Sequence, residues 1–330
     1  MHEKPDQLQI HHQSKFMKAA SRKTFIKTLA IFFSSLMFNI PAIVAALAQE
    51  KKLVPRRKRN VTASRDLAVV RGDDIRQSLR KALEELGGLG LFVKKGDTVV
   101  IKPNIGWSRA PEFAANTNPD LVNELVTLCF RHGAKRVRVF DNTCNNEKMC
   151  YHNSGIQDAV KKAGGEIYYV SDWKFIPGRF PAGSEMQAWP IFRDAVECDC
   201  FINVPVAKHH GLTGLTLSMK NLMGVCGGNR GKMHWNIGEK LADLTAFINP
   251  DLTIIDAYRV LLRHGPSGGN TGDVEMKKTV IAGTDPVLAD SFAAGLFGVA
   301  PESVGYIASA AAKKIGSMKI SSADISRIEL

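Results

Sequence analysis

The sequence predicts an α/β fold in which a mostly parallel sheet is covered by helices. Two observations predict it. From residue 66 onward, short apolar runs of strand length alternate with stretches that have the apolar period of a helix. With 330 residues, 45% of them apolar and 23% charged, the chain can also bury one large core or two modest ones. Strands that alternate with helices are typical of a Rossmann-like architecture, and we expect residues 66–330 to form a single domain.

The first half of this domain is expected to contain four strands and three helices. The strands are predicted at residues 67–70, 98–101, 137–140 and 167–170, and the helices at residues 73–86, 119–132 and 156–163. Asn118 is placed to cap the second helix, and Gly164 follows the end of the third. Residues 171–195 show neither period and contain Trp173, Trp189 and several prolines and glycines, which predicts an irregular insertion.

The second half returns to the alternating pattern. Strands are predicted at residues 200–204, 252–256 and 279–282, and helices at residues 215–223, 239–248, 287–296 and 303–314. Gly283 to Pro286 predicts a helix start, because Thr284 or Asp285 can cap the helix and proline fits its first turn.

The net charge of +12 is concentrated at the N-terminus. Residues 1–59 hold twelve Lys/Arg against three Asp/Glu, which accounts for +9 and leaves +3 for residues 60–330. A nearly neutral body lacks the basic surface of a nucleic-acid-binding domain, so we expect no nucleic-acid partner.

Residues 1–48 are predicted to be an export signal. The run Ser21-Arg22-Lys23-Thr24-Phe25-Ile26-Lys27 precedes an uncharged stretch that ends in Ala46-Leu47-Ala48, a small-x-small cleavage pattern. The run resembles a twin-arginine signal with Lys23 in the place of the second arginine. We therefore expect an exported protein, periplasmic or otherwise extracytoplasmic. If the segment is not cleaved, its roughly 20 apolar residues form a membrane anchor instead.

Residues 49–65 are expected to form a solvated basic linker, because cations are concentrated between Lys51 and Arg59. Next to the N-terminal segment, such a linker can contact anionic lipid headgroups.

The six cysteines suit an exported protein that forms disulfides. Cys144 and Cys150 flank a five-residue loop and are the best candidate pair. Cys129 lies on the apolar face of a predicted helix, whereas a bridge between Cys198 and Cys200 would be strained. There is no C-x-x-C repeat, so the chain has no ferredoxin-type cysteine motif.

Residues 203–231 hold the densest group of side chains that carry chemistry. After Pro205 the run contains Lys208, His209, His210, Thr213, Thr216, Lys220, Asn221, Cys226 and Arg230 among six glycines. Cations, hydroxyls and glycines that allow close approach together predict the binding of an anion.

Polar groups also follow other predicted strands, at the edge where ligands bind in open parallel sheets. We expect these groups and those of residues 203–231 to line one crevice. The candidate catalytic residues are Lys208, His210, Asp141 and Asp256. The candidate ligand- or cofactor-binding residues are Lys102, Asn104, Asn203, Thr213, Lys220, Asn221 and Arg230.

In this crevice Lys208 and Lys220 are expected to hold the anion while His210 transfers a proton and Asp141 or Asp256 orients it. The plain structural alternative is that each group lies in a polar loop or extends into water. The histidines have no compact metal-binding spacing, so we assign no metal ligand. The glycine-rich loops lack the P-loop and G-x-G-x-x-G orders, which disfavours classical nucleotide binding.

These residues resemble a family called domain of unknown function 362, over about residues 66–315 of the chain. The resemblance lies in Ile101-Lys102-Pro103-Asn104, Asp141, Asn203-Val204-Pro205, Lys208, His210, residues 212–216, residues 219–224, Gly265-Pro266, residues 284–287 and Asp290. This sequence differs from similar sequences at Val206 and His209, where those often have Lys and Thr. The anion-binding charge at the first of these positions is therefore missing here.

The resemblance implies redox or cofactor-dependent chemistry, since many similar proteins carry a four-iron ferredoxin module or a twin-arginine signal. Because this chain lacks the ferredoxin cysteines, electron transfer would require a separate iron–sulfur partner. A fainter similarity runs to the nickel-pincer lactate racemase family, but we match none of its ligand residues to this chain.

Three functions remain open at this point. The first is an exported enzyme, either an oxidoreductase or isomerase-like, that binds an anionic small molecule. The second is a non-catalytic module that binds a metal or an organic cofactor. The third is an oxidoreductase that depends on a separate electron-transfer partner. The identity of any cofactor is not predicted.

Overall fold

The computed structural model describes residue 27 and residues 52–330, and residues 52–330 form one unit around a ten-stranded sheet. The expected export signal lies outside the described residues except for Lys27. The strands of the sheet are β1 (Leu67–Arg71), β2 (Thr98–Pro103), β3 (Arg136–Val139), β4 (Glu166–Ile167), β7 (Cys200–Val204), β8 (Val206–His210), β9 (Gly214–Thr216), β10 (Leu252–Leu261), β11 (Val274–Gly283) and β12 (Ile325–Glu329).

The sheet is mostly parallel, as predicted. Its strand order is β12-β1-β11-β10-β7-β2-β3-β4, and β8 branches from it by pairing with β10 and β9. The strands from β10 to β4 pair in parallel, whereas β11 is antiparallel to both β10 and β1. The carboxyl ends of β2, β3 and β7 therefore meet at one edge of the sheet, where ligands bind in such folds.

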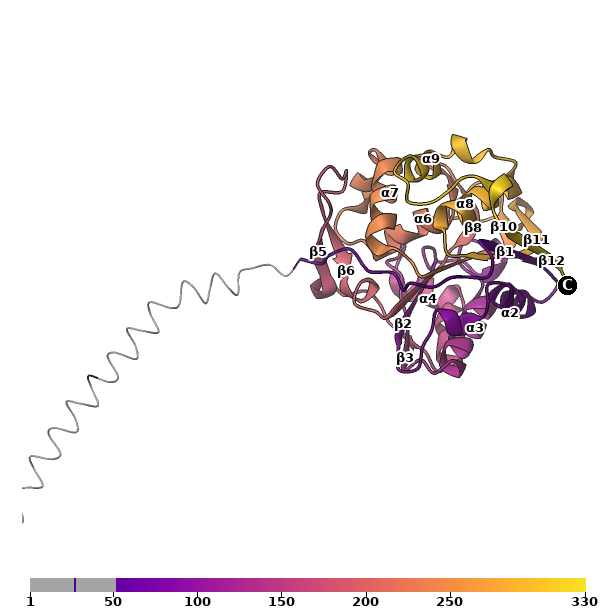
Figure 1. The fold of residues 1–330 in the computed structure, drawn as a ribbon, viewed down its shortest axis with the longest axis horizontal. Coiled ribbons are helices and arrows are strands. Elements are labelled where there is room, and N and C mark those ends of the chain that lie inside the picture. The colour runs from indigo at the N-terminus through magenta and orange to yellow at the C-terminus, as the bar shows by residue number, and fades with distance from the viewer. Residues whose placement is uncertain (1–26, 28–51) are drawn as a thin grey trace, which may run out of the picture. The chain divides into compact units, whose positions relative to one another are not determined.

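Helices cover both faces of this sheet (Figure 1). One face carries α2 (Ile75–Glu85), α3 (Pro119–Arg131), α4 (Glu147–Asn153) and α5 (Ile156–Lys162), and the other carries α6 (Ser218–Asn221), α7 (Ile237–Ile248), α8 (Pro286–Ala294) and α9 (Gly305–Ala312). Alternate residues of a strand serve the two cores: Val99 and Ile101 pack on the first face and Val100 on the second. The α/β architecture predicted from the sequence is confirmed.

Two predicted helix starts are found with the expected capping residues. The side chain of Asn118 accepts a hydrogen bond from the backbone N–H of Asp120 at 3.0 Å. The carboxylate of Asp285 accepts hydrogen bonds from the N–H groups of Val287 and Leu288 at the start of α8. Both caps satisfy backbone donors that a helix terminus leaves without intrahelical partners.

Three predictions of secondary structure are corrected. The insertion at residues 171–195 is not wholly irregular, because β5 (Phe175–Arg179) and β6 (Ala188–Phe192) form a two-stranded sheet. Its Pro177 and Pro190 face each other, which this pair tolerates because neither strand is central in a larger sheet. The predicted strand at residues 167–170 stops at Ile167. The predicted helix at residues 215–223 begins only at Ser218, because residues 214–216 pair with β8.

The described part of the predicted linker is packed on the domain rather than solvated. Leu53 pairs with Gly178 of β5, and Arg56 is buried against Asp251. Arg59 donates to the carboxylate of Asp97 at 2.8 Å. Residues 52–65 therefore belong to the same unit as residues 66–330, and Arg56 and Arg59 form ion pairs with carboxylates of that unit.

All six cysteines are free in the structure, so the predicted pair of Cys144 and Cys150 is not formed. Cys150 lies in α4 and points into the core, whereas Cys144 is exposed in the preceding loop. Cys129 is buried in the core, as predicted. Among the described residues, no helix combines the length and the apolar character that a bilayer crossing requires.

Candidate functional site

A crevice of about 500 Å³ lies beyond the ends of β2 and β3, between the β8–β9 hairpin and α6. Its lining comes from loops and strand ends that are far apart in the sequence. The lining residues are Asn104, Gly106, Trp107, Asp141, Asn142, Cys144, Lys208, His210, Gly211, Leu212, Thr216, Lys220, Asn221, Met223, Gly224, Arg230, Gly231, His234, Gly265 and Pro266.

The structure brings seven of the candidate site residues together in this crevice and leaves four outside its lining. The seven are Asn104, Asp141, Lys208, His210, Lys220, Asn221 and Arg230. Two of the other four, Lys102 and Asn203, are fully buried beneath the crevice. The remaining two, Asp256 and Thr213, lie elsewhere.

Asn221 joins the base of the crevice to the ends of β2 and β7. Its side-chain oxygen accepts hydrogen bonds from the ammonium of Lys102 and the amide of Asn104, both at 3.1 Å. Its amide nitrogen donates to the backbone oxygen of Lys102 and to the side-chain oxygen of Asn203 at 2.9 Å. With all its hydrogen-bonding groups engaged, Asn221 supports the crevice floor and has little capacity left for a ligand.

Lys102 also has no capacity left for a ligand. Its ammonium contacts the backbone oxygen of Pro103 at 2.7 Å, the side chain of Asn221, and the carboxylate of Asp141 at 2.7 Å. Two of these contacts are hydrogen bonds and the third is an ion pair, so groups of the protein already surround the ammonium. Burial lowers the pKa of Lys102, and the charge of Asp141 opposes that shift. The expected ligand-binding role of Lys102 is therefore replaced by a structural one.

Gly224 lies directly over the pair of Lys102 and Asp141. A β-carbon at this position would lie 1.7 Å from Oδ1 of Asp141 and 2.6 Å from Nζ of Lys102. Only glycine allows the backbone to approach the pair this closely. The backbone at Gly224 thus packs closely against the buried pair at the wall of the crevice.

Lys208 enters the crevice from β8 and is almost completely buried, with 1% of its surface exposed. Its ammonium donates to the backbone oxygen of Ala115 at 2.5 Å and contacts Oδ1 of Asn104 at 3.3 Å. None of these partners is a carboxylate. Burial, together with the charge of Lys220, lowers the pKa of Lys208 to about 7, so both its protonation states are populated near neutral pH.

His210 also projects into the crevice from β8, two residues after Lys208. Its Nδ1 accepts a hydrogen bond from the backbone N–H of Leu212 at 3.1 Å, which places the proton of the neutral ring on Nε2. Burial and the charges of Lys220 and Lys208 lower the pKa of His210 to about 3. These contacts favour a neutral hydrogen-bond donor over the proton-transfer role expected from the sequence.

Lys220 is the cation of the crevice that lacks a partner. Only 9% of its surface is exposed, yet its ammonium forms no hydrogen bond or ion pair with any described residue of segment 52–330. Burial lowers the pKa of Lys220 to about 8. Desolvating a charge without a counterion is unfavourable, so a bound anion would relieve this arrangement.

Arg230 is committed in part to the structure around it. Its guanidinium donates to the backbone oxygens of Asn142 and Thr143, the first at 2.6 Å. These bonds tie the loop after β3 to the glycine-rich segment at residues 224–231. Arg230 therefore contributes positive charge to the crevice without being the free bidentate clamp that the sequence suggests.

Asp256 and Thr213 are not part of the crevice, contrary to expectation. The Asp256 carboxylate accepts hydrogen bonds from the backbone N–H groups of Asn118 at 2.7 Å and Tyr258 at 3.0 Å. Burial raises its pKa to about 6. The hydroxyl of Thr213 donates to the backbone oxygen of Leu215 and lines a different pocket. Asp256 thus anchors the start of α3 rather than orienting a histidine.

The donor set of the crevice does not fit a metal ion. Among residues 27 and 52–330, no three His, Cys, Asp or Glu side chains are grouped to hold one. His210 and His234 lie with ring centroids 6.4 Å apart, whereas His209 lines the other pocket and His264 pairs with Asp273. No step through a metal is therefore derived for this site.

Sequence reasoning missed some crevice residues. Trp107 and Met223 supply apolar surface next to the cations, and Cys144 lines the crevice although its position predicts only a disulfide partner. The signal for Trp107 was its position just after the polar run that ends β2. Nothing local marks Met223, because an apolar residue in a short helix is typical of a core position.

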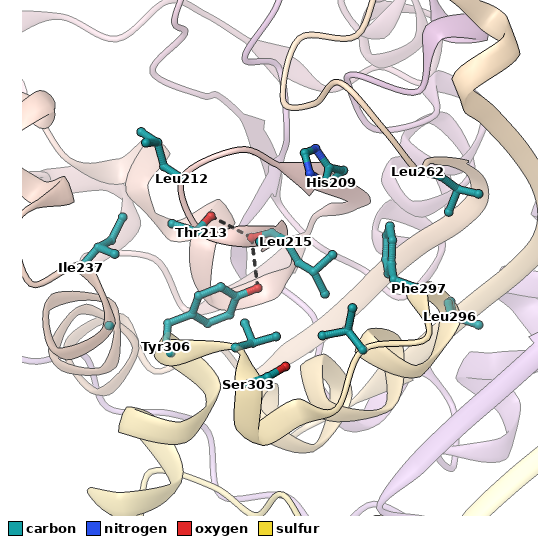
Figure 2. Close-up of a pocket in the computed structure, with 15 residues that line it drawn as sticks. His209, Leu212, Thr213, Leu215, Ile237, Leu262, Leu296, Phe297, Ser303 and Tyr306 are labelled. Carbon is teal, nitrogen blue, oxygen red and sulfur yellow. Dashed lines mark hydrogen bonds between the residues drawn. The ribbon is translucent and has the colours of Figure 1, made fainter.

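A second pocket of about 690 Å³ lies beside the crevice and was not predicted (Figure 2). It is lined by His209, Leu212, Thr213, Gly214, Leu215, Ile237, Gly238, Leu262, Leu296, Phe297, Val299, Ser303, Val304, Gly305 and Tyr306. Leu212 lines both cavities. His209 and His210 point to opposite sides of β8, one into each cavity, because successive strand residues alternate.

A family model agrees with the resemblance seen in the sequence, and two known proteins are similar to the chain. A family model described as Domain of unknown function (DUF362) matches residues 99–295. A thylakoid-associated protein from Synechocystis sp. is 29% identical over 207 residues, which are 60% of this chain and 63% of that protein. The lactate racemase apoprotein from Thermoanaerobacterium thermosaccharolyticum has a TM-score of 0.44 and 13% identity, over 69% of this chain and 56% of its own.

The chain thus spans less than two thirds of the length of these two proteins. All crevice residues, from Asn104 to Pro266, lie within the range matched by the family model. The wall of the second pocket at residues 296–306 lies beyond that range.

Proposed function

The chain belongs to the domain of unknown function 362 family. From this family and from the geometry of the crevice, we propose that the protein binds an anionic small molecule and acts on it by proton transfer. The observation that carries the proposal is Lys220, which lines the crevice with only 9% of its surface exposed and whose ammonium has no counterion there. A carboxylate or phosphate supplies the missing charge.

The balance of charge in the crevice supports an anionic ligand. Lys208, Lys220 and Arg230 contribute positive charge, and Asp141 is the single carboxylate among the described lining residues. Because Asp141 already pairs with Lys102 beneath Gly224, it does not neutralise the other cations. A hollow lined by an excess of one charge attracts ligands of the opposite charge.

We assign the proton transfer to Lys208. With a pKa of about 7, its amine can accept a proton from the bound anion and return it as an ammonium. Lys220 holds the charged group of the ligand, and His210 donates a hydrogen bond from Nε2. This division corresponds to isomerase-like chemistry, in which one residue removes and replaces a proton and no electron carrier takes part.

Titration calorimetry on the full chain tests the binding step. The probes are inorganic phosphate and oxalate, and oxamide serves as the neutral counterpart of oxalate. We expect at least one of the two anions to bind and oxamide not to bind. Binding of oxamide as tight as that of oxalate, or no binding of either anion at millimolar concentration, would contradict the proposal.

We also propose that the protein is exported by the segment at residues 1–48. Supporting this, Arg22 and Lys23 precede an uncharged stretch that ends in a small-x-small pattern. Replacing Lys23 with Gln distinguishes the routes, since export by a twin-arginine pathway should fail while general secretion should continue. Retention of the unaltered protein in the cytoplasm would refute export by either route.

A further inference from the structure

We propose that the ligand is amphipathic, with an anionic group in the crevice and an apolar alkyl or aryl part in the second pocket. The anionic end rests on the proposed function, whereas the apolar end rests on the pocket shown in Figure 2. The two cavities share the side chain of Leu212, no Lys, Arg, Asp or Glu lines the second pocket, and large apolar side chains are exposed on the segments that join the cavities.

Two chain segments run from one cavity to the other. In the β8–β9 turn, Gly211 and Leu212 line the crevice, and Leu212 to Leu215 line the second pocket. In the segment before and at the start of α7, Arg230 and His234 line the crevice, and Ile237 lines the second pocket. A ligand that extends from Lys220 in the crevice to the second pocket would pass Leu212, the residue that lines both cavities.

The second pocket suits an apolar group. No Lys, Arg, Asp or Glu is among its lining residues. The hydroxyls of Thr213 and Tyr306 both donate to the backbone oxygen of Leu215, as Figure 2 shows, so they do not require a polar ligand. Apolar side chains, among them Leu215, Ile237 and the aromatic Phe297, predominate among its lining residues, and its volume of about 690 Å³ is in the range of small-molecule pockets.

Large apolar side chains are exposed on the two segments that join the cavities. Leu212, in the β8–β9 turn, is 74% exposed, and Trp235, between His234 and Ile237, is 81% exposed. These are the highest values among the large hydrophobic residues exposed in the described part of the chain. Exposed apolar surface next to an apolar pocket marks a place where an apolar group binds.

The test compares inorganic phosphate with n-octyl phosphate, using titration calorimetry on the full chain at concentrations below micelle formation. 1-Octanol serves as the tail without the charge. We expect octyl phosphate to bind at least tenfold more tightly than phosphate, because each buried methylene contributes about fourfold to affinity. Octanol should bind more weakly than octyl phosphate.

Two variants at Gly305 locate the tail. Gly305 lines the pocket, and a β-carbon there meets no atom within 4 Å, so a larger side chain can enter the open space. Gly305→Phe should reduce the affinity for octyl phosphate at least tenfold and leave that for phosphate unchanged. Gly305→Ala, the matched control, should change neither affinity.

A third variant, Ile237→Asn, places an amide on the pocket wall without filling the pocket. It should weaken the binding of octyl phosphate and leave that of phosphate unchanged.

The outcomes separate the inference from the proposed function. If phosphate binds and octyl phosphate binds no more tightly, or if neither Gly305→Phe nor Ile237→Asn distinguishes the two probes, the inference is overturned while the anion site stands. If neither phosphate nor octyl phosphate binds while oxalate does, the inference is likewise overturned, and if oxalate also fails to bind, the anion site itself fails. Tight binding of octyl phosphate that is lost in both pocket variants supports the inference.

Discussion

Nζ of Lys102 and Oδ1 of Asp141 lie 2.7 Å apart at the ends of neighbouring parallel strands, covered by the backbone of Gly224. Oδ1 of Asp141 has no aligned hydrogen bond, so its contact with Lys102 is mainly Coulombic. The other carboxylate oxygen accepts from the backbone N–H of Ile105 at 2.6 Å. The pair thus connects β2, β3 and the loop before the crevice, and its stability depends on the space that Gly224 leaves.

Replacing Gly224 with Ala should destabilise the protein by roughly 3–5 kcal/mol, the cost of disrupting a buried ion pair. The added β-carbon would lie within 1.7 Å of Oδ1 of Asp141, so the carboxylate must move away from Lys102. Chemical denaturation of the variant and the unaltered protein measures the difference in unfolding free energy.

Gly295→Ala is the matched control for this prediction. A β-carbon at Gly295 meets no atom within 4 Å, and its backbone does not require glycine. We expect a change within roughly 0.5–1 kcal/mol there, in the stabilising direction. If Gly224→Ala were as stable as Gly295→Ala, the close approach over the ion pair would be refuted.

Replacing Lys220 with Met should weaken phosphate binding by about ten- to hundredfold, since a charge-assisted hydrogen bond contributes roughly 1.5–3 kcal/mol. The same substitution should raise the melting temperature of the unliganded protein, because it removes a buried charge without a partner. Thermal unfolding with and without phosphate measures both effects.

Lys162→Met is the control for charge removal. Lys162 is exposed at the end of α5 and does not line the crevice. It should leave phosphate binding unchanged and alter the melting temperature little. Equal loss of phosphate binding in both variants would indicate a general effect of net charge instead of a specific site.

The affinity for sulfate should fall as the pH rises from about 7 to 9. Sulfate keeps its charge throughout this range, so the change reports on the protein. Burial lowers the pKa of Lys208 to about 7 and that of Lys220 to about 8, and each ammonium that loses its proton binds the anion less well. Calorimetric titration at successive pH values measures the decrease in sulfate affinity. In Lys220→Met, the part of this decrease that occurs near pH 8 should be absent. Binding of sulfate that is independent of pH would contradict these pKa values.

The stability of the unliganded protein should respond in the opposite direction. Because the folded pKa of Lys220 is below its ordinary value of 10.5, the unfolded chain binds more protons between about pH 8 and 10.5. The contribution of Lys220 to stability therefore rises with pH in this window. The difference in unfolding free energy between the unaltered protein and Lys220→Met isolates this term, and a difference that stays constant with pH would refute it.

The long elements could be predicted from the sequence because their signals are local. The helix α3 has a regular apolar face and Asn118 as its cap, and α8 follows Asp285 and Pro286 in the same way. The β8–β9 hairpin could not be predicted, because Lys208 to His210 is polar and has the appearance of a loop. The buried ammonium of Lys208 is stabilised there because it donates a hydrogen bond to the backbone oxygen of Ala115, which lies 93 residues away in the sequence.

The composition of the site was predictable in part for the same reason. Residues that follow parallel strands meet at one edge of the sheet, so the positions of Asn104 and Asp141 could be predicted. Asp256 satisfies the same rule but instead accepts hydrogen bonds from Asn118 and Tyr258. A carboxylate after a strand suits either role, and only the position of α3 decides between them. The second pocket has no local signal, since its apolar lining comes from separate segments.

Replacing Arg56 with Met should destabilise the protein by roughly 3–5 kcal/mol, because it leaves the carboxylate of Asp251 buried without its countercharge. Arg56 also donates to the backbone oxygens of Asn249 and Asp199, both at 3.1 Å, so the same change removes two further hydrogen bonds. Arg57→Met, at the exposed neighbouring position, should change the unfolding free energy by less than roughly 0.5 kcal/mol. Urea denaturation of the three proteins measures the contrast. If the two variants were equally stable, the basic segment would be a solvated linker after all. The reason is that a surface cation contributes little to the free energy of unfolding, whereas removing a buried, paired cation leaves its partner without a countercharge.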